Sequence, residues 1–426
     1  MNKKNIAIIG SGISGISISY FLSNHHNITI FEKNDYFGGH TRTVKIKEED
    51  ISVDTGFLVF NEKCYPNLKK FFENLNVKIE NSDMSLSIIA EELGFEYGSH
   101  NYFSQYKNMK NLSFYIIIKD IFLFYNLAPS YLKNNDEMNL SIEDFFKLKK
   151  YSNEFLYHHI YPIAASIWST NLLDIKKFPI KALIEFFIYN DLFKFINRPK
   201  WKTLTNRGDS YIKEVLKKPN IKAFKNIFIK NIKRESNNIS LYSDKFLGNF
   251  DEIIIATHAD QALNMLSNPS EKEIKILKTF EYTSNEIILH KDYNQMPTNE
   301  KLWSSWNFLG NNDNNLSLTY WLNKLQNLKT NNNYFVTVNP IKEIRDNKII
   351  NKIKFSHPIF TIANYQAKKD ILEIQGINKI WYTGSYLGYG HHEDGILSSI
   401  LIAEKMGITI PWKVNEKTIN KRNLSI

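Results

Sequence analysis

Residues 5–15 have the sequence NIAIIGSGISG, and this stretch decides the fold. Its first five residues form a largely apolar run typical of a buried strand, and residues 16–22 predict a helix after the glycines. Between a strand and a helix, Gly10 permits a tight turn and Gly12 lets a pyrophosphate approach the backbone. Gly15 lets the helix pack closely on its strand. The stretch therefore predicts the first unit of a dinucleotide-binding fold.

An acidic residue follows the next predicted strand. Residues 28–31 have the sequence ITIF, and Glu32 comes directly after them. A carboxylate at this place can accept hydrogen bonds from both ribose hydroxyls of an adenosine and would repel a 2′-phosphate. A glycine turn without a ligand is the alternative for residues 10–15. The strand, the helix and the acid together favour a nucleotide site.

Two later stretches have the character of strands from the same sheet. Residues 221–257 are rich in strand patterns, and residues 377–385 predict a strand that precedes a helix over about 396–406. We therefore predict an α/β fold in which a discontinuous, doubly wound (Rossmann-like) nucleotide-binding domain carries a mixed α+β substrate domain. The expected boundaries are residues 1–80, 205–267 and 375–412 for the nucleotide-binding domain, 81–204 and 268–374 for the substrate domain, and 413–426 for a tail.

The two long inserts differ in pattern. Aromatic and aliphatic runs in the first insert, such as SFYIIIKDIFLFYNL from Ser113, predict helices. Alternating runs in the second insert, such as NEIILH and YFVTVNP, predict strands. Trp303, Trp306, Tyr320 and Trp321 lie in the second insert, where core packing is favoured over a role as the wall of a tunnel.

Composition and charge exclude several classes of site. The 426 residues carry 54 Lys and Arg against 44 Asp and Glu, a formal net charge of +10, but the lysines are spread along the chain, so no nucleic-acid site is predicted. Cys64 is the only cysteine, which excludes an intrachain disulfide and paired-cysteine metal sites. The histidines lack metal-binding spacing, so no metal is expected. The first residues do not resemble a signal peptide, and we expect a cytoplasmic protein.

The sequence after Glu32 resembles a known motif. Residues 32–43, EKNDYFGGHTRT, are similar to the glycine-pair motif that follows the dinucleotide fold in the FAD-dependent amine oxidase and phytoene desaturase superfamily. The resemblance implies FAD as the cofactor. Most members have an arginine directly after the glycine pair, whereas this chain has His40 there and Arg42 two places on. Both residues stay candidates for contact with the phosphates.

The resemblance narrows downstream to one bacterial group of predicted NAD/FAD-binding proteins. It is carried by several stretches spread over nearly the whole chain, among them VDTGFLVFNEKCYPNL, FDEIIIATHADQAL, WSSWN, HPIF and GYGHHEDGILSS. Members of the group are associated with cyclopropane-type fatty-acid methyltransferases. The resemblance thereby implies modification of lipid acyl chains.

The superfamily pattern implies roles for individual positions. It places the start of the chain at the pyrophosphate and ribose, the glycine pair along the phosphates, and later residues at the adenine and the ribityl chain. The cofactor-binding residues implied are Gly10, Gly12, Ser14 and Gly15, then Glu32, then Gly38, Gly39, His40 and Arg42, then Ile229, Gly384, Asp394 and Gly395. For Asp394, a simple helix N-cap is the alternative.

Three polar residues adjoin the expected flavin-facing loop. His391, His392 and Glu393 precede the last predicted helix, and a histidine there could exchange a proton near neutral pH. The resembling group has an aromatic residue at the position of His391, which makes His392 the better catalytic candidate and places Glu393 behind it. Orientation and packing are the alternative role for all three.

The function implied is an FAD-dependent oxidoreductase that removes a hydride from an apolar substrate, best matched by a fatty-acyl or other lipid chain. The electron acceptor that reoxidises the flavin is not specified by the sequence. An amine or porphyrinogen oxidase on the same fold is the first alternative. A non-catalytic lipid-binding protein of the dissociation-inhibitor type is the second, and the intact glycines with Glu32 argue against it.

Membrane contact is a further alternative. Residues 155–173 lack charges but contain histidines, a proline and hydroxyl groups, which argue against a membrane span. Residues 113–126 offer a broad apolar surface that fits either burial or the membrane interface. The positive net charge favours contact with anionic lipid, and the inner face of the membrane is then the expected location.

Overall fold

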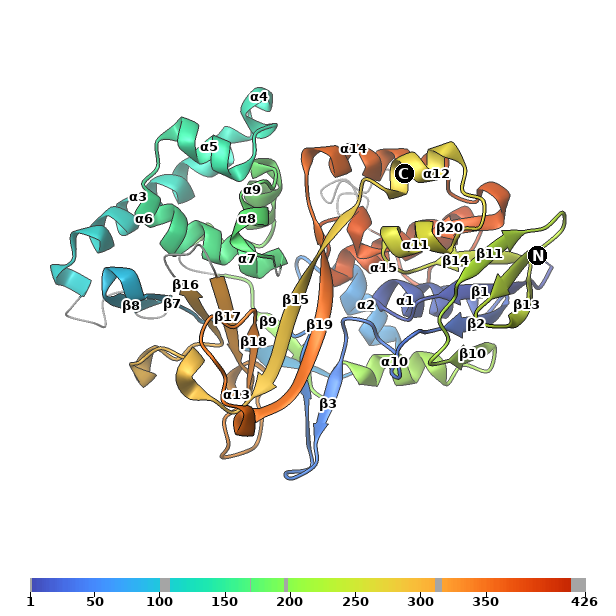
Figure 1. Cartoon of the computed structure of the whole chain (residues 1–426), viewed down its shortest axis with the longest axis horizontal. Helices are drawn as coiled ribbons and strands as arrows, with labels where there is room; N and C mark the ends of the chain where they lie inside the picture. Colours follow the sequence, from blue (N-terminus) through green and yellow to red (C-terminus); the bar gives the residue numbers. More distant parts are fainter. Residues whose placement is uncertain (1, 100–107, 169, 195–197, 311–315, 415–426) are drawn as a thin grey trace.

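The computed structural model describes residues 2–99, 108–168, 170–194, 198–310 and 316–414. Two lobes lie side by side, a nucleotide-binding lobe on the right of Figure 1 and a lobe of helices and a mostly antiparallel sheet on the left. Two long strands run between them. Most of the predicted tail, residues 415–426, lies outside the described residues.

A parallel sheet forms the centre of the nucleotide-binding lobe. Among the described residues it has five strands in the order β10, β2, β1, β14, β20, all parallel. This order is that of a doubly wound sheet and confirms the expected α/β class. The strands come from three separate parts of the chain, while the domain boundaries themselves stay a prediction. They are β1 (Asn5–Ile9), β2 (Asn27–Phe31), β10 (Ile221–Phe224), β14 (Glu252–Ile255) and β20 (Ile380–Tyr382).

Other elements cover both faces of this sheet. Ile6 and Ile8 of β1 point into one core, and Ala7 and Ile9 point into the other, because successive strand residues face opposite sides. The first core is covered by α1 (Ile13–Leu22), α2 (Pro66–Asn74), α10 (Asp209–Leu216) and α15 (His392–Lys405). The second is covered by α11 (Ala259–Met265), α12 (Glu271–Leu277), α14 (Ile362–Asp370) and the antiparallel strands β11 (Asn231–Arg234), β12 (Ile239–Tyr242) and β13 (Phe246–Phe250).

The last helix begins earlier than its sequence pattern indicates. We expected a start near residue 396, but α15 begins at His392. The backbone N–H of His391 donates to the carboxylate of Asp394 at 2.8 Å. Asp394 therefore lies inside the first turn, in a capping box, and the alternative that it is the N-cap itself is wrong.

Both inserts contribute to one large sheet in the second lobe. In its described part, seven strands follow the order β19, β15, β18, β17, β16, β7, β8. Strand β7 of the first insert pairs with β16 of the second. The strands are β7 (Leu86–Ala90), β8 (Phe95–Gly98), β15 (Glu281–His290), β16 (Trp306–Gly310), β17 (Leu316–Trp321), β18 (Phe335–Val338) and β19 (Ile349–Ile359). Smaller strands form two further sheets, one of β3 (Thr43–Ile46) and β4 (Ile51–Asp54), the other of β5 (Phe60–Asn61), β9 (Trp201–Leu204) and β6 (Ile79–Ser82).

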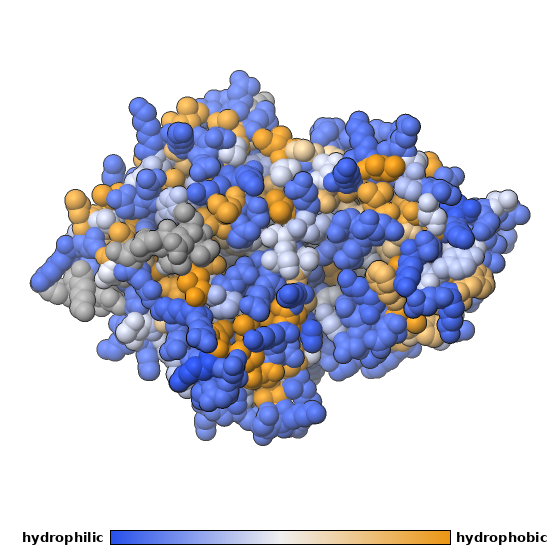
Figure 2. All heavy atoms as spheres, in the orientation of Figure 1, coloured by the Kyte–Doolittle hydropathy of each residue, from blue (hydrophilic) through white to orange (hydrophobic). Residues whose placement is uncertain are grey.

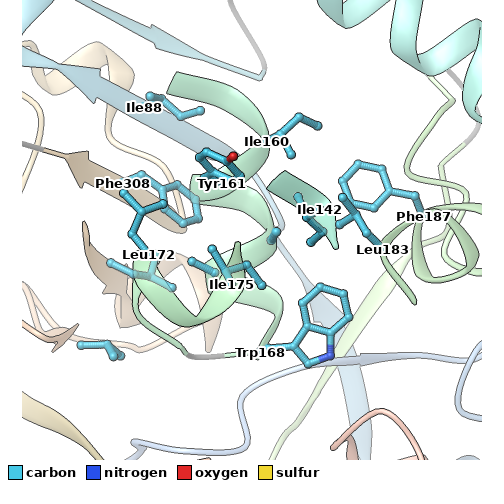
Figure 3. Packing of buried hydrophobic residues seen from close by; sticks show 14 of the residues in the cluster. Ile88, Ile142, Ile160, Tyr161, Trp168, Leu172, Ile175, Leu183, Phe187 and Phe308 are labelled. Carbon is cyan, nitrogen blue, oxygen red and sulfur yellow. The ribbon is translucent and has the colours of Figure 1, made fainter. Parts of the chain in front are cut away.

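Helices pack on one face of the large sheet, as the apolar runs of the first insert predict. Figure 3 shows Tyr161 of a helix lying against Ile88 of β7 and Phe308 of β16, all in one buried cluster. The main helices are α3 (Leu112–Tyr131), α5 (Ile142–Lys149), α7 (Tyr161–Trp168) and α9 (Ile180–Tyr189). Shorter ones are α4 (Asn135–Met138), α6 (Asn153–Phe155), α8 (Leu172–Ile175) and, beside the sheet, α13 (Leu322–Leu325).

One helix of the described residues, α3, is long and apolar enough to cross a membrane by length and composition alone. Phe114, Ile117 and Phe124 on its inner side are fully buried in the core of the helical lobe. Only 39% of its most apolar window is buried, however, because its outer side faces solvent. The uncharged stretch 155–173 is broken into short helical pieces and contains many buried residues, consistent with the expectation that it is no span.

Gly15 provides a test of the packing of α1 against β1 and the turn between them. A Cβ at Gly15 would lie 1.9 Å from the carbonyl oxygen of Gly10, so Gly15→Ala forces α1 away from β1. We expect this variant to lower the free energy of unfolding by about 3 kcal/mol in urea titrations. Gly12→Ala is the matched control, because a Cβ there meets no atom within 4 Å. An equal loss of stability in both variants would contradict the packing role of Gly15.

Candidate nucleotide and substrate site

A cavity of about 660 Å³ opens at the carboxyl ends of the parallel strands, where open α/β sheets bind their ligands. We call it the nucleotide cavity. Its volume lies within the range of small-molecule and cofactor sites. Of the cofactor-binding residues expected from the sequence, those lining it are Gly10, Gly12, Ser14, Glu32, Gly38, Gly39, His40, Arg42, Ile229 and Gly384.

The three glycines of the first turn occupy different surroundings. Gly10 has a φ of +98°, and a Cβ there would lie 2.9 Å from the carbonyl oxygen of Ala256. Gly15 lies in the first turn of α1, faces Gly10 and does not line the cavity. A Cβ on Gly12 would meet no protein atom, which leaves the backbone there open for the close approach of a pyrophosphate.

Glu32 connects the glycine turn to the glycine pair. Its buried carboxylate accepts hydrogen bonds from the backbone N–H of Ser11 at 3.0 Å and from the Ser11 hydroxyl at 2.6 Å. The same hydroxyl accepts from the backbone N–H of Gly38 at 3.1 Å. Ser11 was not singled out from the sequence, since it is a variable position of the glycine motif. The acid therefore lies where it can both hold the loop and meet a ribose.

Arg42 and His40 face different environments. The Arg42 guanidinium lies 4.7 Å from the ring centroid of Tyr36 and lines only the nucleotide cavity. His40 Nε2 lies 3.1 Å from the carbonyl oxygen of Ser356, and burial lowers the pKa of His40 to about 4. His40 is therefore uncharged at neutral pH. The geometry favours Arg42 as the positive partner of the phosphates.

A second cavity of about 290 Å³ adjoins the first and is lined mainly by apolar side chains. We call it the apolar cavity. Trp306 and Tyr320 belong to its wall, with ring centroids 4.8 Å apart, whereas Trp303 and Trp321 pack against each other and do not line it. Tyr320 is at the same time part of the buried core and Trp306 packs against that core, whereas Trp303 and Trp321 are only partly buried, so core packing and a place in the cavity wall coincide in the first pair. The residues shared by both cavities, here called the junction, are His40, Phe355, His357, Pro358, Gly390 and His392.

Partly buried histidines concentrate around the junction. The rings of His40 and His357 lie 4.9 Å apart, and His258 stacks on Tyr282 at 4.2 Å. Burial, the largest cause, lowers the pKa of His258 to about 3 and that of His357 well below its usual range. These imidazoles are therefore neutral near pH 7. Among the described residues, no group of three or more His, Cys, Asp or Glu is placed to hold a metal ion.

His392 lies at the junction as the first residue of α15. Its Nε2 is 2.9 Å from the Thr41 hydroxyl, and its ring stacks on Phe57 at 3.8 Å. Burial is the main cause that lowers the pKa of His392 to about 3. The side chain thus faces both cavities as a neutral, well-held group.

Glu393 points away from both cavities. Its carboxylate accepts from the backbone N–H of Asn67 at 3.1 Å, from the Asn67 side chain at 2.8 Å and from the backbone N–H of Leu68 at 2.9 Å. These groups belong to the first turn of α2, so Glu393 caps that helix. This position corrects the expectation that Glu393 exchanges a proton with a substrate.

Asp394 and Gly395 also lie outside the nucleotide cavity. Asp394 completes the capping box of α15, and a Cβ on Gly395 would lie 2.7 Å from Ile13. Successive helix residues point in different directions, so only His392 of this run reaches the junction. Both residues therefore have structural roles, and their contact with a cofactor stays a prediction.

Replacing the Glu393 carboxylate by an amide tests the capping role. Glu393→Gln puts an amino group against backbone N–H donors, and we expect the free energy of unfolding to fall by about 1–3 kcal/mol. Glu404→Gln, on the exposed end of the same helix, is the matched control and should change stability by less than about 0.5 kcal/mol. Unchanged stability of Glu393→Gln in thermal and urea unfolding would refute the cap.

Comparison with known proteins agrees with this geometry. Residues 8–75 match the NAD(P)-binding Rossmann-like domain family. An 86-residue stretch is 31% identical to the L-amino-acid oxidase of Gloydius halys, covering 19% of this chain and 17% of that protein. The chain thus matches less than a fifth of the length of this relative.

Solved structures resemble the chain over nearly its whole length. A CLA-producing fatty acid isomerase from P. acnes has a TM-score of 0.68 at 13% identity, over 94% of this chain and 98% of that one. Putrescine oxidase bound to putrescine has a TM-score of 0.69 at 11% identity, over 95% and 99%. Identities this low show a common fold. The chain therefore shares the fold of these proteins, and its residues 8–75 match a Rossmann-like nucleotide-binding domain.

Proposed function

We propose that this chain is a flavin-dependent oxidoreductase that binds FAD in the nucleotide cavity and oxidises a fatty-acyl chain in the apolar cavity. One observation carries the choice of substrate. Among the described residues that line the apolar cavity there is no Asp or Glu, and the only fixed charge is that of Arg198. An apolar chain needs no charged partner there, whereas an ammonium group would lie in this wall without a counter-ion.

The cofactor proposal rests on residues that fit an adenine dinucleotide. The open backbone at Gly12, the cation of Arg42 and the carboxylate of Glu32 match a pyrophosphate and a ribose. When bound, FAD supplies the acceptor for the hydride that leaves the substrate carbon. The presence of all three residues also argues against a lipid-binding protein without a flavin.

The side chains at the junction hold neighbouring groups in place and exclude water from the meeting point of the two cavities. Phe57, stacked on His392, and Phe355 line the apolar cavity where it meets the nucleotide cavity, and they exclude water from the place where substrate and cofactor meet. With a pKa near 3, His392 is a weak proton acceptor at neutral pH. We therefore assign His392 the role of holding Thr41 and Phe57 in place, and not that of a general base.

The alternative functions require different side chains in the lining of the apolar cavity. An amine oxidase would act on a substrate that is a cation when protonated. The described lining has no Asp or Glu to pair with that cation, so it does not favour an amine. The likeness to a fatty acid isomerase is consistent with an acyl substrate and makes rearrangement of a double bond the second candidate reaction. The bacterial group that the sequence resembles is associated with cyclopropane-type fatty-acid methyltransferases. Modification of acyl chains is consistent with both oxidation and rearrangement of a double bond.

Absorption spectroscopy tests the function directly. After reconstitution with FAD, the purified protein should show flavin bands, and anaerobic addition of fatty acids or membrane lipid extract should bleach them. Buffer and a short-chain amine are the controls and should leave the bands unchanged.

A protein that stays colourless after reconstitution would overturn the cofactor proposal. Bands that persist with every acyl ligand while the amine bleaches them would move the assignment to an amine oxidase. An altered acyl product without net bleaching would favour the isomerase.

We also propose peripheral contact between α3 and the inner face of the membrane. On the outer side of this helix Phe122 is 50% exposed and Leu123 is 43% exposed, with Leu112, Tyr115 and Leu127 also exposed. Figure 2 shows apolar groups exposed among polar ones over the helical lobe at the upper left. Exposed Lys119 lies on the same helix and complements anionic lipid.

Vesicle co-sedimentation tests the membrane contact. Phe122→Glu combined with Leu123→Glu should reduce binding to phosphatidylglycerol vesicles at least tenfold, because two charges replace apolar groups that would enter the interface. Phe246→Glu, at an exposed phenylalanine of the nucleotide-binding lobe, is the control and should bind as the wild type does. Equal binding by all three proteins, or no binding by the wild type, would refute the contact.

A further inference from the structure

We propose that Arg198 binds the oxyanion at the end of the apolar substrate, which we take to be the terminal carboxylate of a free fatty acid. The inference rests on the proposed function, because it specifies the substrate of the same cavity. Arg198 lines the apolar cavity and is at the same time exposed to solvent. A residue with both properties lies at the mouth of the cavity.

The guanidinium of Arg198 has terminal N–H donors that can bind a ligand. Its Nε donates to the carbonyl oxygen of Lys194 at 2.6 Å, which fixes the direction of the side chain. Among the described residues, the two terminal nitrogens have no hydrogen-bond acceptor and no carboxylate within ion-pair distance. An arginine stays charged in any protein environment, and its planar fork matches the two oxygens of a carboxylate. The mouth therefore presents an unneutralised cation with the geometry for an oxyanion.

The neighbouring polar groups do not compete for this role. His159 lines the same cavity, and its two ring nitrogens lie 3.1 Å from the hydroxyls of Tyr97 and Tyr125. Burial, and then the positive charge of Arg198, lower the pKa of His159 to about 3. The imidazole is therefore neutral and already hydrogen-bonded. Arg198 remains the only group of fixed charge among the described residues of the lining.

A head group bound at the mouth determines where the chain lies. Most of the lining behind Arg198 is apolar, with Ile163, Phe187 and Phe308 among its members, so a carboxylate would lose hydration without gaining a partner if it moved inward. The chain would therefore extend from Arg198 toward the junction with a fixed register. Arg198 then selects which carbon meets the flavin, and acts as a specificity-determining residue.

A lipid phosphate shares the chemistry of an oxyanion on an apolar chain. The experiment must distinguish it from a carboxylate. We would titrate flavin-loaded protein with oleate, methyl oleate and oleoyl lysophosphatidate below their micelle concentrations, and follow the flavin spectrum and tryptophan fluorescence. The proteins compared are the wild type, Arg198→Ala and Arg198→Lys. Lys200→Ala is the matched control, because Lys200 is an exposed cation of the same segment that does not line the cavity.

We expect Arg198→Ala to weaken oleate binding by about tenfold to a hundredfold and to change methyl oleate binding less than threefold. Arg198→Lys should recover part of the loss, and Lys200→Ala should bind as the wild type does. Because Arg198 is exposed, its replacement leaves the core intact, and a normal flavin content verifies the fold.

Each contrary outcome identifies what fails. Equal binding of oleate and methyl oleate by a flavin-loaded wild type overturns the anchor and leaves the acyl substrate standing. A loss with oleoyl lysophosphatidate alone overturns the carboxylate in favour of a lipid phosphate. If no acyl ligand binds to flavin-loaded protein, both the anchor and the acyl substrate fail. Absence of flavin from the wild type overturns the proposed function itself.

Discussion

Close packing between α1 and α15 is the contact on which the rest of the site depends. The Ser14 hydroxyl donates to the carbonyl oxygen of Gly395 at 3.2 Å, and the Ser399 hydroxyl donates to the carbonyl oxygen of Ser14 at 2.9 Å. Without a side chain at Gly395 the two helices can approach this closely. Because His392 begins α15, the packing also sets where the junction lies. The glycine turn and the start of α15 at the junction are therefore positioned as one unit.

Much of the fold could be predicted because its decisive signals are local. The glycine turn, the strand before it and Glu32 lie within 28 residues, from Asn5 to Glu32, and the structure confirms their arrangement. The start of α15 could not be predicted, because it depends on an N–H of His391 that reaches the Asp394 carboxylate. Chemistry was assigned to Glu393 from its neighbours in sequence. A helix points successive side chains about 100° apart, so neighbours in sequence need not face the same cavity.

The apolar cavity was harder to predict, because its wall is assembled from distant segments. Trp306 and Tyr320 are directly opposite each other on paired strands, so both face the cavity. Trp321 is the next residue along β17 and points to the other face. Only the strand register separates these tryptophans, and the composition of the segment does not show it. Arg198 likewise gave no signal, since a single basic residue outside a motif resembles any other surface charge.

The order of the strands has a consequence for biosynthesis. Strand β1 leaves the ribosome early, but its neighbour β14 and the helix α15 that covers it are translated much later. Until then the nascent chain exposes the apolar faces of β1 and α1, which are fully paired only after residue 405 has emerged. Such a chain completes its first lobe only after α15 has been translated, and the apolar surface that stays exposed until then is prone to aggregation.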